Sequence, residues 1–150
     1  MEAQNFLVEL EAILVPTEYK QALKKNVPDG CLFLKKGSYV FLAMPFDRVP
    51  DADFTSDLAR AVVRSVTFSF PIIAEKGLFL LYFGARSKWE GTTKDFRVDK
   101  TGLKPVILQS IHFVDPVTGF NMNSRTHWGP IKFGFCKGVI GRIEEFCARV

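Results

Sequence analysis

Apolar residues recur at the spacing of an α-helix in three separate parts of the chain. In residues 2–14 they are three or four positions apart, with glutamates between them. The same spacing recurs in residues 54–66, after Asp53, a residue type that favours helix starts, and again in residues 139–150. Because this periodicity places apolar side chains on one side of a helix, it predicts an N-terminal, a central and a C-terminal amphipathic helix.

Short apolar runs bounded by turn residues predict strands between these helices. Residues 31–34 and 39–44 flank KKGS, and this arrangement predicts a hairpin. The run LFLLYFGA at 78–85 is apolar at successive positions, which is typical of a strand buried on both faces. The other features predicted here are strands at 96–98, 105–114 and 129–135 and a turn at DPVTG, 115–119.

These elements predict a fold of the α+β class. We expect a single domain over residues 1–150, with a mainly antiparallel sheet of about five to seven strands packed by the N-terminal, central and C-terminal helices. The element order is similar to that of the profilin-like and roadblock-like folds, which run helix, two strands, helix, three strands, helix. This resemblance implies a scaffold for interaction or ligand binding rather than an enzyme.

Fifteen phenylalanines are an unusual number for a chain of 150 residues. Phenylalanine buries a large area and has no polar group, so these side chains must lie in a core, a pocket or an interface. A phenylalanine-packed core is the ordinary explanation, and any surplus beyond it indicates a binding function. We therefore expect an aromatic-rich pocket or surface that binds a small apolar or aromatic ligand or a partner protein, and a homodimer or other homo-oligomer.

The cysteines and the N-terminus bear on the cellular context. Cys31, Cys136 and Cys147 form no C-x-x-C pair, so neither a zinc site nor dithiol chemistry is predicted. The N-terminal residues are acidic, unlike those of a secretory signal, and the longest apolar run is too short to span a membrane. These features predict a cytoplasmic protein with no cofactor and no membrane partner.

Both histidines lie in the stretch QSIHFVDPVTGFNMNSRTHWG, residues 109–129. Its polar part, residues 121–129, predicts a loop rich in hydrogen-bonding groups, and loops on a rigid sheet often carry recognition residues. The residues expected to bind a ligand are Asn121, Asn123, Arg125, His127, Trp128 and His112.

Two catalytic interpretations of this stretch have weaker support. A metal site would combine His112, Asp115 and His127, but within a strand His112 and Asp115 point to opposite faces, and Asp-Pro favours a turn. A nucleophile could be Ser110, which shares a strand face with His112, or Ser124, but no G-x-S-x-G motif surrounds either. No metal ligand or catalytic residue is therefore predicted, and a hydrolase around His112 and His127 is kept as an alternative.

The second half of the chain is basic, with 12 basic and 6 acidic residues in 76–150. Its densest part, 85–104, interleaves cations with aromatic side chains, a pattern typical of phosphate or nucleic-acid surfaces. Acidic residues in the same segment would partly cancel its charge. Anion or nucleic-acid binding is thus the first alternative to the binding-domain hypothesis. The residues expected to bind an anion are Arg86, Lys88, Trp89 and Arg97.

Overall fold

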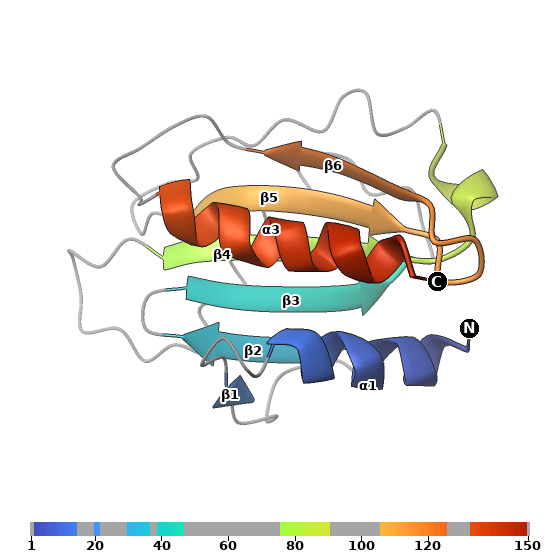
Figure 1. Cartoon of the computed structure of the whole chain (residues 1–150), viewed down its shortest axis with the longest axis horizontal. Helices are drawn as coiled ribbons and strands as arrows, with labels where there is room; N and C mark the ends of the chain where they lie inside the picture. The colour runs from blue at the N-terminus through green and yellow to red at the C-terminus, as the bar shows by residue number, and fades with distance from the viewer. Residues whose placement is uncertain are drawn as a thin grey trace.

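The structure is a computed structural model that describes residues 2–14, 20–21, 30–36, 39–46, 76–90, 106–125 and 133–149. In these stretches the chain forms two α-helices, a short 3-10 helix and six strands (Figure 1). In chain order they are α1 (Ala3–Leu14), β1 (Lys20–Gln21), β2 (Leu32–Lys36), β3 (Tyr39–Pro45), β4 (Lys76–Phe83), η3 (Arg86–Lys88), β5 (Val106–Val114), β6 (Asn121–Arg125) and α3 (Phe133–Cys147). Helices packed on a sheet of mixed strand direction agree with the predicted α+β class.

The six strands form one sheet in the order β1-β2-β3-β4-β5-β6. The pairs β1–β2, β2–β3 and β5–β6 are antiparallel, whereas β3–β4 and β4–β5 are parallel. The sheet is therefore mixed, and the expectation of a mainly antiparallel sheet is wrong. Tight turns, which a sequence pattern reveals, join antiparallel neighbours, but parallel neighbours need a long crossover. The two crossovers run through residues 46–75 and 84–105.

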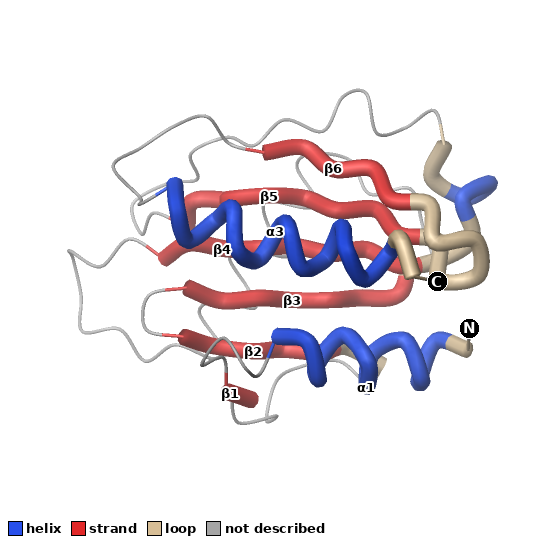
Figure 2. Tube along the Cα trace, in the orientation of Figure 1, coloured by secondary structure: helices blue, strands red, loops and turns tan. Residues whose placement is uncertain are grey.

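Helices α1 and α3 lie side by side on one face of the sheet, α1 in front of β2 and α3 in front of β4 and β5 (Figures 1 and 2). Phe6, Leu10 and Leu14 of α1 are fully buried in this layer, which confirms the apolar face predicted for this helix. The buried residues that α3 contributes are Val139, Ile143, Phe146 and Cys147. Among the described helices, none is long and apolar enough to cross a membrane.

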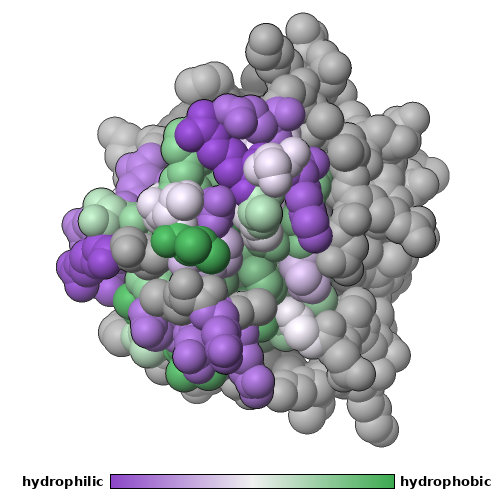
Figure 3. Space-filling view, turned by 90° about the vertical axis from the view of Figure 1, so that its right-hand side faces the viewer, coloured by the Kyte–Doolittle hydropathy of each residue, from purple (hydrophilic) through white to green (hydrophobic). Residues whose placement is uncertain are grey.

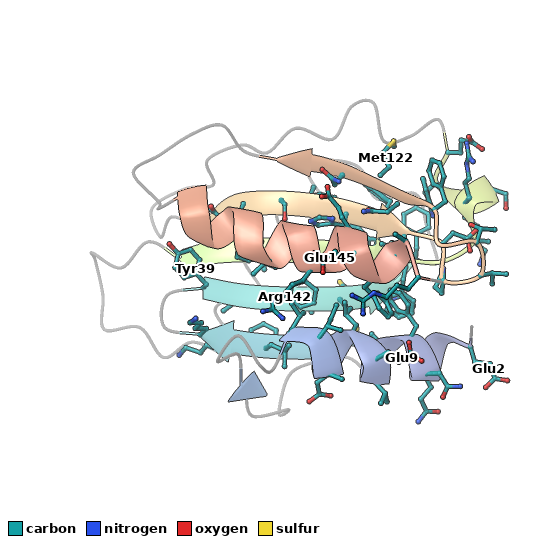
Figure 4. The ribbon with its side chains drawn as sticks, in the orientation of Figure 1. Glu2, Glu9, Tyr39, Met122, Arg142 and Glu145 are labelled. Atoms are coloured by element: carbon teal, nitrogen blue, oxygen red, sulfur yellow. The ribbon has the colours of Figure 1, made fainter. Side chains whose placement is uncertain are left out.

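The two helices pack through the rings of Phe6 and Phe146, whose centroids are 5.4 Å apart, and an arginine adds a hydrogen bond between them. Nη1 of Arg142, on α3, donates a hydrogen bond to the carbonyl oxygen of Ile13 at 3.3 Å, and Figure 4 shows this side chain pointing from α3 toward the end of α1. The last carbonyls of a helix have no partner within the helix and carry its negative dipole end. Arg142 therefore satisfies one of these carbonyls and adds a polar contact to the apolar packing of the two helices.

The opposite face of the sheet carries a second cluster, in which five of the ten buried residues are aromatic. The ring centroids of Phe46 and Tyr82 are 5.8 Å apart, and those of Phe46 and Phe113 are 5.9 Å apart, both in edge-on geometry. Tyr82 and Phe113 stack at 5.5 Å. We call this second cluster the aromatic cluster. Its buried members are Phe33, Val40, Leu42, Phe46, Leu78, Leu80, Tyr82, Trp89, Ile111 and Phe113. Because clusters lie on both faces, β3 and β4 are buried on both sides, which explains their continuous apolar sequences.

Burial in these two layers accounts for most of the phenylalanines whose side chains are described. Eight of those nine side chains are buried, and Phe120 is partly exposed. A filled core thus explains most of the surplus in this part of the chain, and Phe120 marks the place where a ring reaches the surface. The buried ones are Phe6, Phe33, Phe41, Phe46, Phe79, Phe83, Phe113 and Phe146.

Strand β5 contains one residue more than β4 along their parallel pairing. Leu78 pairs with Leu108, and the next residue, Phe79, pairs with Ser110. Gln109 is therefore the extra residue of a β-bulge, and it is buried. From Ser110 onward, every residue of β5 is shifted by one position relative to β4.

Several predicted elements are confirmed. β2 and β3 pair as the expected hairpin, from Leu32 opposite Ala43 to Lys36 opposite Tyr39. β4 and β5 correspond to the strands predicted at 78–85 and 105–114. The first and last helices are also present, although α3 begins earlier than predicted.

Two other assignments are wrong. Residues 121–125 form β6 rather than a loop, because their backbone pairs with β5 despite their polar side chains. Residues 133–135, expected in a last strand, form the first turn of α3, where the helix overrides their local strand pattern. The central helix at 54–66, the strand at 96–98 and residues 129–132 lie outside the described residues.

Two glycines of α3 offer a test of the described packing. At Gly138 and Gly141 an added Cβ would meet no atom within 4 Å. Glycine in a helix is less favourable than alanine by about 0.5–1 kcal/mol, because its unfolded state has more freedom. We expect Gly138→Ala and Gly141→Ala each to raise the free energy of unfolding by about that amount in urea denaturation. Gly77→Ala is the control: its Cβ would lie 2.7 Å from the Tyr39 ring and should lower stability. Equal effects at all three positions would contradict the packing.

Candidate functional site

The carboxyl-terminal ends of β3, β4 and β5 lie at one edge of the sheet, because these strands are parallel. This is the right-hand end of Figure 1, where η3 follows β4 and a turn follows β5. Two backbone hydrogen bonds join the chain beyond the strands: Phe46 N donates to Phe83 O at 2.8 Å, and Gly84 N donates to Val114 O at 2.9 Å. Binding sites of sheets with parallel strands tend to lie outside these ends.

The carboxylate of Asp115 connects η3 to the turn after β5. Its Oδ2 accepts a hydrogen bond from the backbone N–H of Arg86 at 3.1 Å, and its Oδ1 accepts from those of Val117 at 2.9 Å and Thr118 at 3.4 Å. Burial by itself raises the pKa of this carboxyl, but hydrogen bonds from the three backbone N–H groups and the Thr118 side chain together outweigh it, so the pKa of Asp115 lies below its ordinary value of 3.8. Asp115 is thus a charged residue that holds two segments together.

The turn itself is closed by backbone hydrogen bonds. Gly119 N donates to Asp115 O at 2.9 Å, and Asp115 N donates to Phe120 O at 2.9 Å. Gly119 has a φ of 69°, in the left-handed region that favours glycine. The sequence DPVTG therefore forms the turn that was predicted, and it presents Val117 to solvent at 71% exposure.

Trp89 is buried beneath η3 and the turn after β5. Its side chain is fully buried, its Nε1 donates a hydrogen bond to the Gly84 carbonyl at 3.2 Å, and its ring lies 5.7 Å from Phe113 and 5.6 Å from Phe120. From the basic sequence around it, Trp89 was predicted to lie on an anion-binding surface. That assignment is wrong, because a ring with no exposed area cannot stack on a nucleobase.

Arg86 covers the partly exposed ring of Phe120. Its guanidinium carbon lies 3.8 Å from the centroid of Phe120, within the range of a cation–π contact. Its Nε donates to Glu90 Oε1 at 3.0 Å, and its Nη2 donates to the same oxygen. Three interactions thus hold one exposed arginine: its backbone N–H on Asp115, its guanidinium face on Phe120 and its edge on Glu90.

We name five residues of this region the corner surface: the exposed Arg86, Lys88, Glu90 and Val117 and the partly exposed Phe120. Figure 3 looks onto this end of the molecule, and apolar and hydrophilic groups alternate on its described part. The carboxylate of Glu90 offsets the charge of Arg86, so Lys88 is the cation of the corner surface that has no ion pair within the described residues. Arg97, the fourth predicted anion-binding residue, lies outside the described residues.

The residues predicted to bind a ligand fall in a different place. His112 is fully buried in β5, and its Nε2 lies 3.0 Å from Ser110 Oγ. Asn123 lies opposite His112 in the β5–β6 pairing, and its Nδ2 donates to Glu144 Oε1 of α3 at 3.1 Å. The structure therefore brings His112 and Asn123 together, as a polar layer between β5–β6 and α3 rather than as an exposed loop.

The other predicted ligand-binding residues are only partly accounted for. Asn121 and Arg125 belong to β6, opposite Val114 and Ser110. His127 and Trp128 lie outside the described residues. Within the described stretches, no group of three or more metal-ligating side chains gathers.

The potential nucleophiles in and near this layer are Cys147 of α3 and Ser110 of β5. Burial raises the pKa of the Cys147 thiol to about 11, and the charge of nearby Glu144 adds to this effect. Cys147 is therefore a protonated, unreactive thiol at neutral pH. The Ser110–His112 pair is equally enclosed, since neither side chain has exposed area. In this conformation the pair contributes a hydrogen bond to the core, and a substrate has no access to it.

Sequence reasoning missed the contributions of Glu90, Val117 and Phe120 to this corner. The i, i+4 spacing of Arg86 and Glu90 was a readable signal for an ion pair. The contact between Arg86 and Phe120 had no such signal, because it depends on the parallel neighbours β4 and β5 ending together.

Comparison of the chain with protein-family models, with curated proteins and with solved structures gives no significant match. The likeness to the profilin-like and roadblock-like folds thus rests on element order alone.

Proposed function

We propose that this protein is a small, non-catalytic interaction domain of the cytoplasm, and that the corner surface recognises a partner protein. The observation that carries the proposal is the arginine held over Phe120, next to the exposed Val117. The cytoplasmic location rests on the sequence, where the cysteines show no paired spacing.

The chemistry of the corner surface resembles that of energetically important positions in protein interfaces. Arginine and aromatic residues are enriched at such positions, and an apolar side chain beside them supplies area that can be buried. Asp115 and Glu90 already hold the backbone and guanidinium of Arg86, so little side-chain entropy remains to be lost on binding. These features favour a flat protein surface as the partner.

The same observations give less support to the alternatives. A small aromatic ligand needs an open cavity, whereas the rings of the aromatic cluster contact one another directly. An anion or nucleic acid would need exposed cations and a stacking ring, but Glu90 occupies Arg86 and Trp89 is buried. A hydrolase would need an accessible nucleophile, and Ser110 is enclosed.

A matched pair of valine variants tests the proposal. Val117 of the corner surface and Val8 of α1 are both exposed, at 71% and 62%. Proteins that bind the unmodified domain would be selected from a displayed library of small proteins, and their affinity would be measured again for Val117→Asp and Val8→Asp. We expect Val117→Asp to weaken most selected binders by about tenfold or more, as for a charge introduced into an apolar contact, and Val8→Asp to have little effect.

The opposite pattern would overturn the proposal. If selected binders lose affinity with Val8→Asp but not with Val117→Asp, recognition belongs to α1. If salt-sensitive binding of an oligonucleotide is found and Lys88→Glu removes it, the domain binds anions instead.

A further inference from the structure

The ion pair between Arg86 and Glu90 uses only some of the hydrogen-bonding groups of each side chain. Both hydrogen bonds between Arg86 and Glu90 end on Glu90 Oε1, and they use only Nε and Nη2 of the guanidinium. A guanidinium has five N–H donors and a carboxylate has two acceptor oxygens. In the described part of the chain, Arg86 Nη1 and Glu90 Oε2 make no hydrogen bond, and the two side chains are 44% and 57% exposed.

The charges of this corner are balanced. Arg86 and Lys88 are offset by Glu90 and by Asp115 beneath them. A strongly acidic or strongly basic partner therefore gains no electrostatic advantage here. A surface that carries both an unused donor and an unused acceptor is complementary to itself, which is the requirement for a contact across a two-fold axis.

We infer that the partner of the corner surface is a second copy of this chain, bound about a two-fold axis. Nη1 of Arg86 donates to Oε2 of Glu90 of the partner subunit, and the reciprocal bond forms on the other side of the axis. This arrangement joins two intrachain pairs into one ring of four charges. The inference rests on the proposed function, because it names the partner of the same surface.

Val117 and Phe120 supply the apolar part of this contact. Val117 projects from a turn that Asp115 holds, so two copies can bring these side chains together without rearranging the backbone. The corner surface has five residues, whereas stable interfaces contain about 20–30 residues a side. We therefore expect a weak dimer, with a dissociation constant on the order of 10–100 μM.

Charge reversal and mixing test the proposed contact. Arg86→Glu gives the corner surface of each subunit two carboxylates, and Glu90→Arg gives it two guanidinium groups. Measured by sedimentation velocity, the unmodified chain should dimerise with increasing concentration, and each variant alone should sediment as a monomer because like charges face each other. An equimolar mixture of Arg86→Glu and Glu90→Arg should form a heterodimer, because its two corner surfaces are complementary.

Two controls separate this contact from other effects. Lys88→Glu makes the same change of charge on η3 without touching the Arg86–Glu90 pair, and it should weaken dimerisation less than Arg86→Glu does. Val117→Asp should abolish dimerisation and Val8→Asp should preserve it. Circular dichroism checks that each variant is folded, which the exposure of these side chains favours.

Three results would overturn the inference. The unmodified chain could remain monomeric at about ten times the expected dissociation constant. The single variants could dimerise as well as the unmodified chain, or their mixture could stay monomeric. Failure of the proposed function is distinguishable from these results: it appears in the library experiment as binders that are insensitive to Val117→Asp, whatever the oligomeric state.

Discussion

Replacing Trp89 with alanine is expected to lower the free energy of unfolding by about 3–5 kcal/mol, the range for large aromatic residues in a core. The indole has no exposed area, contacts the rings of Phe113 and Phe120, and donates a hydrogen bond to Gly84. Urea denaturation followed by circular dichroism at neutral pH measures the change.

Trp89→Phe is the conservative comparison, because it keeps a ring but loses the N–H donor to the Gly84 carbonyl. We expect it to lower the free energy of unfolding by about 1–2 kcal/mol. A surface tryptophan would behave differently: its replacement by alanine would change stability by no more than about 0.5 kcal/mol. A change that small would contradict the burial of Trp89 and would support its predicted place on a binding surface.

Replacing Asp115 with alanine is expected to lower the free energy of unfolding by about 2–4 kcal/mol at neutral pH. The substitution removes three hydrogen bonds from backbone N–H groups to a charged acceptor and leaves those groups unsatisfied. Asp115→Asn keeps an acceptor for Val117 and Thr118 but loses the charge, so its effect should be about half as large.

The effect of Asp115→Ala should depend on pH in one direction. The pKa of Asp115 in the folded protein is below 3.8, its ordinary value in the unfolded chain. The stability that this carboxylate contributes is therefore fully present above pH 3.8 and is lost as the pH falls below that value. Denaturation curves across this range should converge for the unmodified protein and Asp115→Ala.

Glu145→Gln is a suitable control for this experiment. Glu145 is an exposed carboxylate of α3 that forms an ion pair with the exposed Arg149 at 3.9 Å. Its neutralisation should change stability by no more than about 0.5 kcal/mol. If Asp115→Ala has an effect as small as this, or one that grows in acid, then Asp115 does not hold η3 to the turn.

Local patterns in the sequence predicted the elements of the fold better than their arrangement. The helical spacing of Phe6, Leu10 and Leu14 and the antiparallel pairing of β2 with β3 each depend on residues close in the chain, and both are confirmed. The parallel pairing of β4 with its two neighbours depends on long crossovers, which leave no local signal. The continuous apolar sequence of β4 was the one indication that this strand lies at the centre of a two-sided sheet.

The candidate site shows the same division. Asp115 was correctly assigned to a turn, because Asp-Pro and a following glycine specify that conformation over five residues. Trp89 was misassigned because its flanking cations suggested a surface, whereas its burial depends on Phe113 and Phe120 from other parts of the chain. The polar sequence of β6 suggested a loop, but Asn123 is polar because it faces Glu144 beneath α3.

The bulge at Gln109 determines which face of the sheet each later residue of β5 occupies. With this residue present, His112 pairs with Leu81, a member of the layer beneath α1 and α3. If Gln109 instead paired with Phe79 in a regular ladder, His112 would lie opposite Tyr82, among the rings of the aromatic cluster. The bulge therefore determines on which face of the sheet Ser110 and His112 lie. Deleting Gln109 would make the ladder regular and still leave Ser110 opposite Phe79 and His112 opposite Leu81.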